Sequence, residues 1–216
     1  KKVMIARGEI KVDTKFSVKE LAKTKVIFED DDILVVDKPA FITADEVAKT
    51  FKDAILLNRL DKETSGVMMF AKNEEFQKKA IKEFAQNRVY KEYVAIVEGK
   101  VVEEIVIDKP ILTTKDRGVA KWKVDKNGKS AKTTVYPLLV EGNKSKIKLV
   151  IESGRTHQIR VHLNFVGLPI IGDAIYGRTA SNVNRVLLHS KITKIFDYTF
   201  EAREPKEFKV YDFSWN

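Results

Sequence analysis

Residues 58–72, NRLDKETSGVMMFAK, decide the fold of this chain and its chemistry. The first half of this stretch is polar, and residues 59–65 include six charged or hydroxyl side chains. The second half, residues 66–71, is an apolar run of strand length that begins at a glycine, which is typical of a buried strand. Polar loops beside rigid strands often carry catalytic side chains. The stretch therefore predicts a polar loop that leads into a core strand, although its chemistry alone also fits a solvated turn.

The composition is that of a globular protein. At 216 residues and 44% hydrophobic residues, the chain can bury the core of one large domain or two small ones. Its apolar runs are too short to span a membrane. The absence of cysteine excludes disulfides, Fe–S clusters and thiol catalysis, and fits the cytoplasmic location that we expect. Because the first residue is Lys rather than Met, we expect a trimmed N-terminus, with any targeting segment outside the sequence.

The charge balance points to a polyanionic partner. Lysine and arginine total 40 against 31 acidic residues, which gives a net charge of +9. Nucleic acid is the commonest partner of such a surface. The alternative is a lysine-rich surface that only interacts with water. A basic helix on a membrane surface is disfavoured, because no long stretch combines a basic face with an apolar one.

Local patterns predict alternating strands and helices. Short strands are expected on both sides of the acidic turn at Asp30–Asp32, whose three carboxylates lack the spacing of a calcium loop. Apolar residues at helical spacing predict a helix over 74–86, and a strand is expected over 88–99. Residues 101–151 alternate short apolar runs with Asp/Asn/Gly turns, which is typical of antiparallel hairpins. A further helix is expected to end at Gly167.

The central stretch resembles the active-site motif of RluA-type pseudouridine synthases, whose pattern is His-Arg-Leu-Asp-x-x-Thr-Ser-Gly. Asn58 stands where the family usually has His. Both side chains donate and accept hydrogen bonds, but Asn does not titrate near neutral pH. If the family His only positions the loop, Asn can replace it. If the charge of the His matters, RNA binding or rate would differ here.

Further motifs follow in the order of the family. Residues 30–39, DDDILVVDKP, resemble its first motif, although Ala40 replaces the usual glycine and the connection to the catalytic loop is short. Residues 91–99, KEYVAIVEG, resemble its tyrosine motif, and residues 154–163, GRTHQIRVHL, its third motif. The resemblance spans about residues 26–210, including strand-like segments at 186–190, 196–200 and 204–210.

The resemblance implies a role for six residues. Asp61 is expected to act as nucleophile or general base, Arg160 to pair with it and keep it charged and oriented, and Tyr93 to stack on the flipped uracil. Arg59 is expected to fill the space that the flipped base leaves in the RNA. Leu163 is expected to line the base pocket and Lys62 to contact a phosphate.

The implied fold is α/β (α+β), with a mixed, largely antiparallel sheet and flanking helices. Residues 26–216 would form the catalytic domain, and residues 1–25 resemble part of an S4 RNA-binding domain or form an N-terminal arm. The implied substrate is uridine in RNA. The chain most resembles the RluC-like members of the family, so large-subunit ribosomal RNA is the expected target, with transfer RNA as an alternative. Because the reaction is an isomerisation, no cofactor or metal is expected. We expect a monomer.

Two other functions remain open on the sequence. A glycosidase would pair Asp61 with Glu63 or Glu152, because such enzymes need two carboxylates at a defined separation. A non-catalytic RNA-binding or ribosome-assembly protein could keep the same fold.

His157 and His162, five positions apart without an acidic partner, do not match a zinc motif.

Overall fold

The computed structural model describes residues 23–116, 119–177, 183 and 185–209. The predicted S4-like segment therefore lies almost wholly outside the described residues. The strands are β1 (Lys25–Glu29), β2 (Ile33–Lys38), β3 (Ile55–Leu56), β4 (Ser65–Ala71), β5 (Tyr90–Glu98), β6 (Ile105–Asp108), β7 (Ile111–Asp116), β8 (Val119–Val124), β9 (Lys132–Glu141), β10 (Lys144–Ile151), β11 (Leu188–Ile195) and β12 (Tyr198–Glu201). The helices are α1 (Ala44–Ala48), α2 (Glu74–Ala85), α3 (Gln158–Phe165) and the short 3₁₀ helix η1 (Lys206–Lys209).

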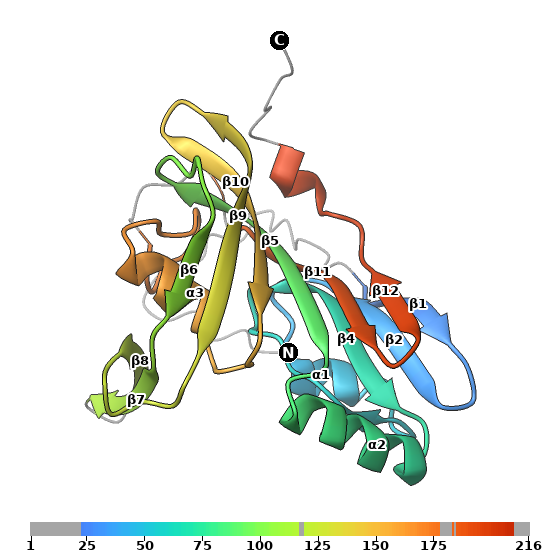
Figure 1. The fold of residues 1–216 in the computed structure, drawn as a ribbon. Coiled ribbons are helices and arrows are strands. Elements are labelled where there is room, and N and C mark those ends of the chain that lie inside the picture. The colour runs from blue at the N-terminus through green and yellow to red at the C-terminus, as the bar shows by residue number, and fades with distance from the viewer. Residues whose placement is uncertain (1–22, 117–118, 178–182, 184, 210–216) are drawn as a thin grey trace, which may run out of the picture.

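One long sheet runs through the molecule in the order β1-β2-β4-β11-β5-β10-β9-β6 (Figure 1). Strand β12 pairs with β11, β3 pairs with β4, and β7 and β8 form a separate hairpin. Only β4 and β11 are parallel to each other among the described pairs. The expected mixed, largely antiparallel sheet with flanking helices is confirmed.

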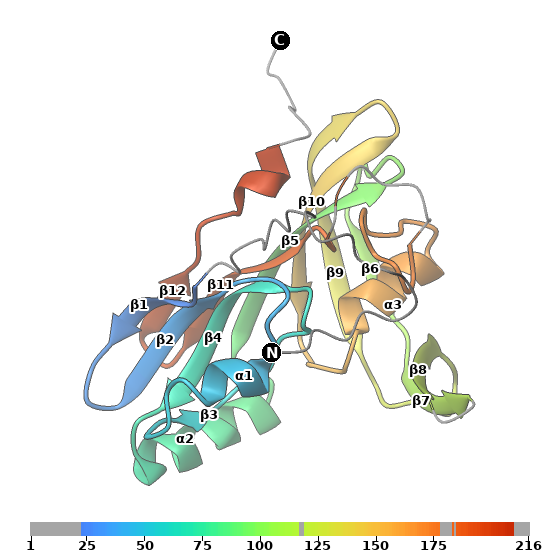
Figure 2. The same ribbon diagram turned by 180° about the vertical axis from the view of Figure 1, so that it is seen from behind.

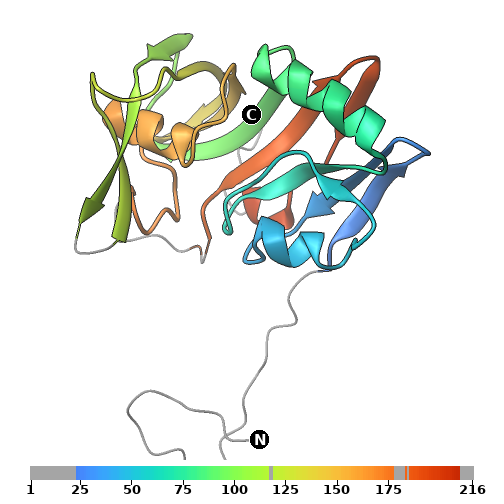
Figure 3. The ribbon, with the colours of Figure 1, turned by 90° about the horizontal axis from the view of Figure 1, so that it is seen from below.

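The two-residue period of β2 and β4 explains how helices cover both faces of this half of the sheet. Val67 and Met69 face one side, where they pack in a cluster with Phe76 of α2. Met68 and Phe70 face the other side, in a cluster that includes α1. Figure 3 shows the two helices on opposite sides of these strands. All seven residues of β4 are therefore buried, as the apolar run predicts.

The other half of the sheet packs on α3. Figure 2 shows α3 beside β9 and β6, with the β7–β8 hairpin extending below it. Ile159 and Leu163 of α3 join the largest apolar cluster, which contains residues of β5, β9, β10 and the segment before β11. The first six residues of the helix, 158–163, are all buried, including Arg160 and His162. The loop before β4 thus belongs to one half of the sheet, and the start of α3 packs on the other half.

Two local features differ from the sequence expectations. The connection between β2 and β4 contains α1, whose N-cap Thr43 and Glu46 form a reciprocal capping box. Residues 206–209 form a 3₁₀ helix where a strand over 204–210 was expected. Pro205 explains the second difference, because it lacks an N–H for a ladder and its fixed φ suits the start of a helix. The acidic turn is an ordinary one, in which Asp30 accepts from the N–H groups of Asp32 and Ile33.

Gly66 sets the contact between β4 and β11. Its φ is +117°, and an added Cβ would lie 2.1 Å from the carbonyl oxygen of Ser190. The preceding Ser65 hydroxyl lies 2.9 Å from Nδ1 of His189 and accepts from Arg185. A buried hydroxyl network and a glycine thus fix the strand that follows the polar loop.

We predict that Gly66→Ala lowers the free energy of unfolding by about 3 kcal/mol or more, because both strain and a backbone clash oppose the methyl group. Gly142→Ala is the matched control: its φ is +55°, but nothing lies within 4 Å of an added Cβ. It should cost about 1–2 kcal/mol. Urea unfolding followed by circular dichroism measures both, and equal losses would contradict the close approach of β11.

Candidate active site

A cleft of about 490 Å³ lies where the two halves of the sheet meet. The loop before β4 forms one wall, and the segment leading into α3 forms the opposite wall. The lining residues are Thr43, Ala44, Arg59, Leu60, Asp61, Lys62, Thr64, Tyr93, Ile151, Gly154, Arg155, Thr156, His157, Gln158, Ile159, Arg160 and Leu188. The described lining carries four Lys or Arg side chains and a single carboxylate, that of Asp61. The cleft is therefore suited to an anionic ligand.

Hydrogen bonds of two side chains, Lys38 and Asn58, fix the polar loop. Nζ of Lys38, a fully buried residue, donates to the carbonyl oxygens of Pro39, Ile42 and Lys62 at 2.9, 2.7 and 3.2 Å. Oδ1 of Asn58 accepts from the N–H of Met69 at 2.7 Å. Asn58 thus ties the loop to β4 through a neutral hydrogen bond. A positioning role of this kind does not require the charge of a histidine.

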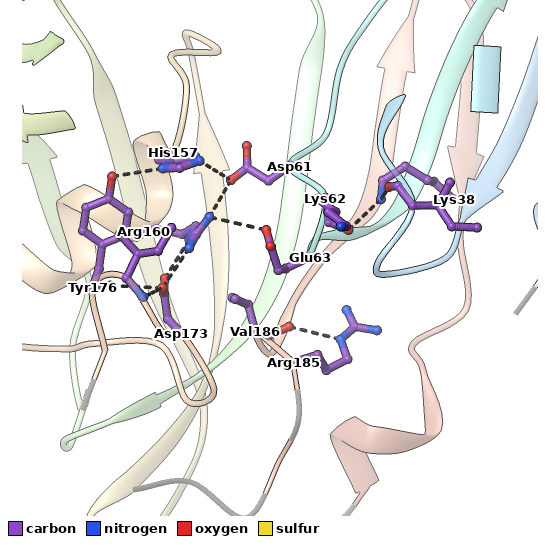
Figure 4. Close-up of polar contacts among 12 residues, drawn as sticks. Lys38, Asp61, Lys62, Glu63, His157, Arg160, Asp173, Tyr176, Arg185 and Val186 are labelled. Atoms are coloured by element: carbon purple, nitrogen blue, oxygen red, sulfur yellow. Dashed lines mark hydrogen bonds and ion pairs between the residues drawn. The ribbon is translucent and has the colours of Figure 1, made fainter. Parts of the chain in front are cut away.

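Asp61 meets Arg160 across the cleft (Figure 4). Nη1 of Arg160 donates to Oδ2 of Asp61 at 3.2 Å. The Asp61 side chain is 21% exposed, whereas that of Arg160 is 2% exposed. The carboxylate is therefore open to the cleft on one side and held by a buried cation on the other. The expected contact between these two residues, 99 positions apart, is present in the structure.

A second carboxylate fixes the guanidinium. Arg160 donates from Nε and Nη2 to the two carboxylate oxygens of Asp173, at 2.7 and 2.8 Å. Oδ1 of Asp173 also accepts from the N–H groups of Ile175 and Tyr176. Burial raises the pKa of Asp173, but the bonds and charge of Arg160 outweigh it and leave the pKa lowered. Burial likewise opposes the charge of Arg160, while Asp173 and Asp61 together raise its pKa.

His157 approaches Asp61 from the wall that leads into α3. Its Nε2 lies 3.8 Å from Oδ2 of Asp61, and its Nδ1 lies 2.9 Å from the hydroxyl of Tyr176. Burial raises the pKa of Tyr176 to about 12, so its hydroxyl is protonated at neutral pH and can donate to Nδ1. Burial lowers the pKa of His157 more than Asp61 raises it, which favours the neutral ring. His157 has a φ of +54°, at the N-cap of α3.

The other predicted site residues are divided. Tyr93 and Lys62 line the cleft, and burial raises the pKa of Tyr93 to about 12, so its hydroxyl keeps its proton at neutral pH. Arg59 also lines the cleft, but its guanidinium forms a two-pronged ion pair with Asp45 of α1 at 3.0 and 3.2 Å. The structure corrects the prediction that Leu163 lines the base pocket. Leu163 is 0% exposed in the core and does not line the cleft. Its side chain is on the face of α3 that packs on the sheet.

Several residues of the site were not predicted from the sequence. Asp173 lies in the stretch LPIIGDAIYG, but no local pattern shows that it pairs with Arg160. Thr64 lines the cleft, and its hydroxyl oxygen is the one buried polar side-chain atom without a hydrogen-bond partner in the described part of the chain. His162 is structural, because its two ring nitrogens contact Thr133 and the carbonyl of Lys109.

No group of three or more His, Asp or Glu side chains that could hold a metal occurs in the described residues. No helix in this part of the chain is long and apolar enough to cross a membrane. Glu152 pairs with Lys132 at 2.8 Å outside the cleft, and Glu63 lies 3.9 Å from Arg160 without lining the cleft. The site thus presents one carboxylate in a basic cleft beside a buried tyrosine.

A basic cleft of this kind is typical of proteins that bind nucleic acid. The model of the RNA pseudouridylate synthase family matches residues 32–165, and the chain belongs to this family. A Helicobacter pylori (strain J99) protein described as an uncharacterised RNA pseudouridine synthase is 46% identical over 210 residues, covering 97% of this chain and 86% of that protein.

Two further similarities agree with this family. The ribosomal large subunit pseudouridine synthase D of Nitrosomonas europaea is 32% identical over 179 residues, covering 74% of this chain and 52% of that protein. The solved structure of human RNA pseudouridylate synthase domain containing 1 has a TM-score of 0.76 and 26% identity, covering 91% of this chain and 89% of that one. The chain is therefore an RNA pseudouridine synthase, an isomerase whose partner is RNA.

We predict that removing the charge of either carboxylate that contacts Arg160 lowers stability, but by different amounts. Asp173→Asn should lower the free energy of unfolding by about 3–5 kcal/mol, because it leaves the buried guanidinium without its two-pronged partner. Asp61→Asn should lower it by at most about 1–2 kcal/mol, because Asp173 still holds the arginine. Urea unfolding at pH 7 measures both.

The pH dependence gives a control for the same pair. Because the pKa of Asp173 is lowered in the folded chain, its contribution to stability is fully present above its ordinary pKa of 3.8 and is lost as the pH falls through the lowered value. The stability advantage of the wild type over Asp173→Asn should therefore shrink below pH 3.8. A larger loss for Asp61→Asn than for Asp173→Asn would contradict this assignment.

Proposed function

We propose that this enzyme converts specific uridines of large-subunit ribosomal RNA to pseudouridine, with Asp61 as nucleophile or general base. The observation that carries the proposal is the contact between Asp61 and Arg160 across the cleft, at 3.2 Å. Asp61 supplies the one carboxylate of the described cleft lining, and it is partly exposed there. The buried guanidinium of Arg160 places a positive charge beside this carboxylate and orients it through the hydrogen bond.

The chemistry needs little beyond a positioned carboxylate. The C–N glycosidic bond of uridine breaks, the uracil turns, and a C–C bond forms from C5, which loses a proton while the released N1 gains one. No group leaves the substrate and nothing is oxidised or reduced, so the isomerisation balances without a co-reactant. Arg160 also supplies a cation beside the developing charge, which is most effective in a partly buried site.

The target base must also leave the RNA stack, which costs on the order of a few kcal/mol. Tyr93 offers a flat face to the flipped uracil, and stacking of this kind stabilises by about 1–3 kcal/mol per base. Lys62 lines the cleft as a cation for a phosphate.

Arg59 is suited to fill the space left by the base. Its side chain is 67% exposed, and it is held only by the exposed Asp45. An exposed ion pair contributes about 0–1 kcal/mol, so RNA can displace Asp45 at little cost. The planar guanidinium can then stack where the base was.

The two other functions fit the site less well. A glycosidase needs a second carboxylate facing the substrate, and neither Glu63 nor Glu152 lines the cleft. A purely RNA-binding protein has no use for a carboxylate at the centre of a basic cleft. Asn58, the departure from the family pattern, makes the hydrogen bond that holds the loop.

The ribosomal target is supported by the name of the Nitrosomonas europaea relative, a large-subunit synthase designated D, whereas the sequence resemblance favoured an RluC-like target. This chain spans about half the length of that relative. Transfer RNA remains the alternative target. Monomeric state and a cytoplasmic location stay predictions.

We predict that Asp61→Asn abolishes pseudouridine formation. The variant protein should still bind RNA with an affinity within about fivefold of the wild type. Mapping of pseudouridines in ribosomal and transfer RNA, from cells with and without the protein, identifies the substrate. Single-turnover assays on that RNA then measure the rate. Glu63→Gln is the matched control, and it should keep most of the activity because its carboxylate lies outside the cleft lining.

Three outcomes would count against the proposal. Pseudouridine formed by Asp61→Asn would remove Asp61 from the chemistry. Release of free uracil by the wild type would favour a glycosidase. RNA binding without any product in the wild type would favour a non-catalytic role.

For Arg59, we predict that Arg59→Ala lowers kcat/KM by one to two orders of magnitude, because the vacated space in the RNA is no longer filled. Asp45→Ala, which removes only the partner of Arg59 in the free protein, should leave kcat/KM within about fivefold. Steady-state kinetics on the mapped substrate compares the two. An equal loss in both variants would mean that Arg59 serves to anchor α1 and does not enter the RNA.

A further inference from the structure

A second hollow of about 480 Å³ lies beside the cleft, between the β7–β8 hairpin and the segment that leads into α3. Gly154, Arg155 and Thr156 line both spaces. The two hollows are therefore neighbours that have this segment as a common wall. No role proposed above uses it.

The walls of the second hollow are held by backbone contacts. Ile111 and Lys129 exchange two N–H to carbonyl bonds of 2.9 Å each, which closes the base of the hairpin. An added Cβ on Gly128 would lie 2.3 Å from the carbonyl carbon of Ile111, so only glycine allows this approach. A hollow with fixed walls costs a ligand little reorganisation.

Trp122 of β8 supplies a flat aromatic surface in the second hollow. Its ring centroid lies 4.5 Å from that of His157, and the two planes are 51° apart. His157 in turn lies 3.8 Å from Asp61. The indole is thus separated from the reacting carboxylate by a single side chain.

The polar lining matches a nucleotide. Lys129 and Arg155 supply cations and Asn127 an amide, and the described lining contains no carboxylate. Arg155 lines both hollows, and its Nε donates to the carbonyl of Ser130 at 3.0 Å. A cation that lines two neighbouring hollows is suited to the phosphate that links two successive nucleotides.

We propose that the second hollow binds a nucleotide next to the target uridine in the chain, with its base stacked on Trp122 and the linking phosphate at Arg155. This inference rests on the proposed function. It assigns to Trp122 the recognition of an unstacked neighbour, so that the enzyme would hold two successive nucleotides outside the RNA helix. Trp122 is then a residue that sets specificity and takes no part in the chemistry.

Tryptophan fluorescence tests the binding directly. Trp122 and Trp215 are the two tryptophans of the chain, so Trp215→Phe leaves Trp122 as the only reporter. Binding of a hexamer of uridine ribonucleotides, followed by anisotropy of an end label, should quench Trp122 fluorescence. A hexamer of abasic ribose phosphates should bind through charge without quenching. Equal signals from the two, or a uridine hexamer that fails to bind or binds without quenching, would overturn the proposal.

Kinetics on the mapped RNA substrate gives a second test. Trp122→Ala should raise KM by about five- to a hundred-fold, the effect of one lost base stack, with kcat within about threefold. Trp122→Phe should restore KM to near the wild-type value. An abasic residue beside the target uridine, on the 5′ or the 3′ side, should raise KM for the wild type by a similar factor but add nothing further in Trp122→Ala.

The two proposals fail in different ways. If the wild type forms pseudouridine and Trp122→Ala has an unchanged KM, the second subsite is wrong and the proposed function stands. If the losses from Trp122→Ala and from the abasic substrate multiply, Trp122 acts by shaping the protein and the subsite is again wrong. If the wild type forms no pseudouridine in any RNA, the proposed function fails, whatever the fluorescence shows.

Discussion

The site depends on one buried guanidinium that is shared between two carboxylates. Arg160 is almost fully buried, and burying an unpaired charge would be prohibitive. Asp173 offsets this cost with two hydrogen bonds, and its own charge is supported by two backbone N–H groups. Nη1 of the guanidinium then lies on the cleft side, within 3.2 Å of Asp61. In the proposed mechanism, stability and chemistry therefore depend on different nitrogen atoms of one side chain.

The sheet gives this arrangement its rigidity. The loop that carries Asp61 begins at Asn58, which is bonded to β4, and ends at Gly66, where β4 runs close against β11. Lys38 fills the space behind the loop with three hydrogen bonds to carbonyl oxygens, although burial and the nearby Arg185 lower its pKa to about 8. With α1 and α2 covering both faces of β4, the loop has few ways to move. A preorganised carboxylate of this kind needs little rearrangement when the substrate binds.

The sequence predicted those parts of the fold whose signal is local. Phe76 and Ala80 repeat at helical spacing, and both are buried on α2. The capping box of α1, Thr43 with Glu46, is also local, but helix α1 is only five residues long and carries too little periodicity to be recognised. The strand expected at 204–210 came from the resemblance, and it was wrong because residues 206–209 form a 3₁₀ helix after Pro205.

The site was predictable only in part, because its decisive contacts are not local. The motif resemblance brought Asp61 and Arg160 together across 99 positions. It gave no reason to add Asp173, which is recognisable only once the turn after α3 folds back on that helix. Leu163 was misplaced for a related reason. Residues 158–163 of α3 are all buried, so sequence position alone does not tell the cleft side of the helix from the core side.

If Arg160 is the common support of both carboxylates, Asp173 influences the chemistry only through Arg160. A double-mutant cycle of Asp173→Asn and Arg160→Lys, read as the single-turnover rate of pseudouridine formation by folded protein, tests it most directly. The account predicts that the double variant is no slower than the slower single variant, because both changes break the same support of Asp61. Rate losses that multiply would show that the two residues act independently, and would contradict the account.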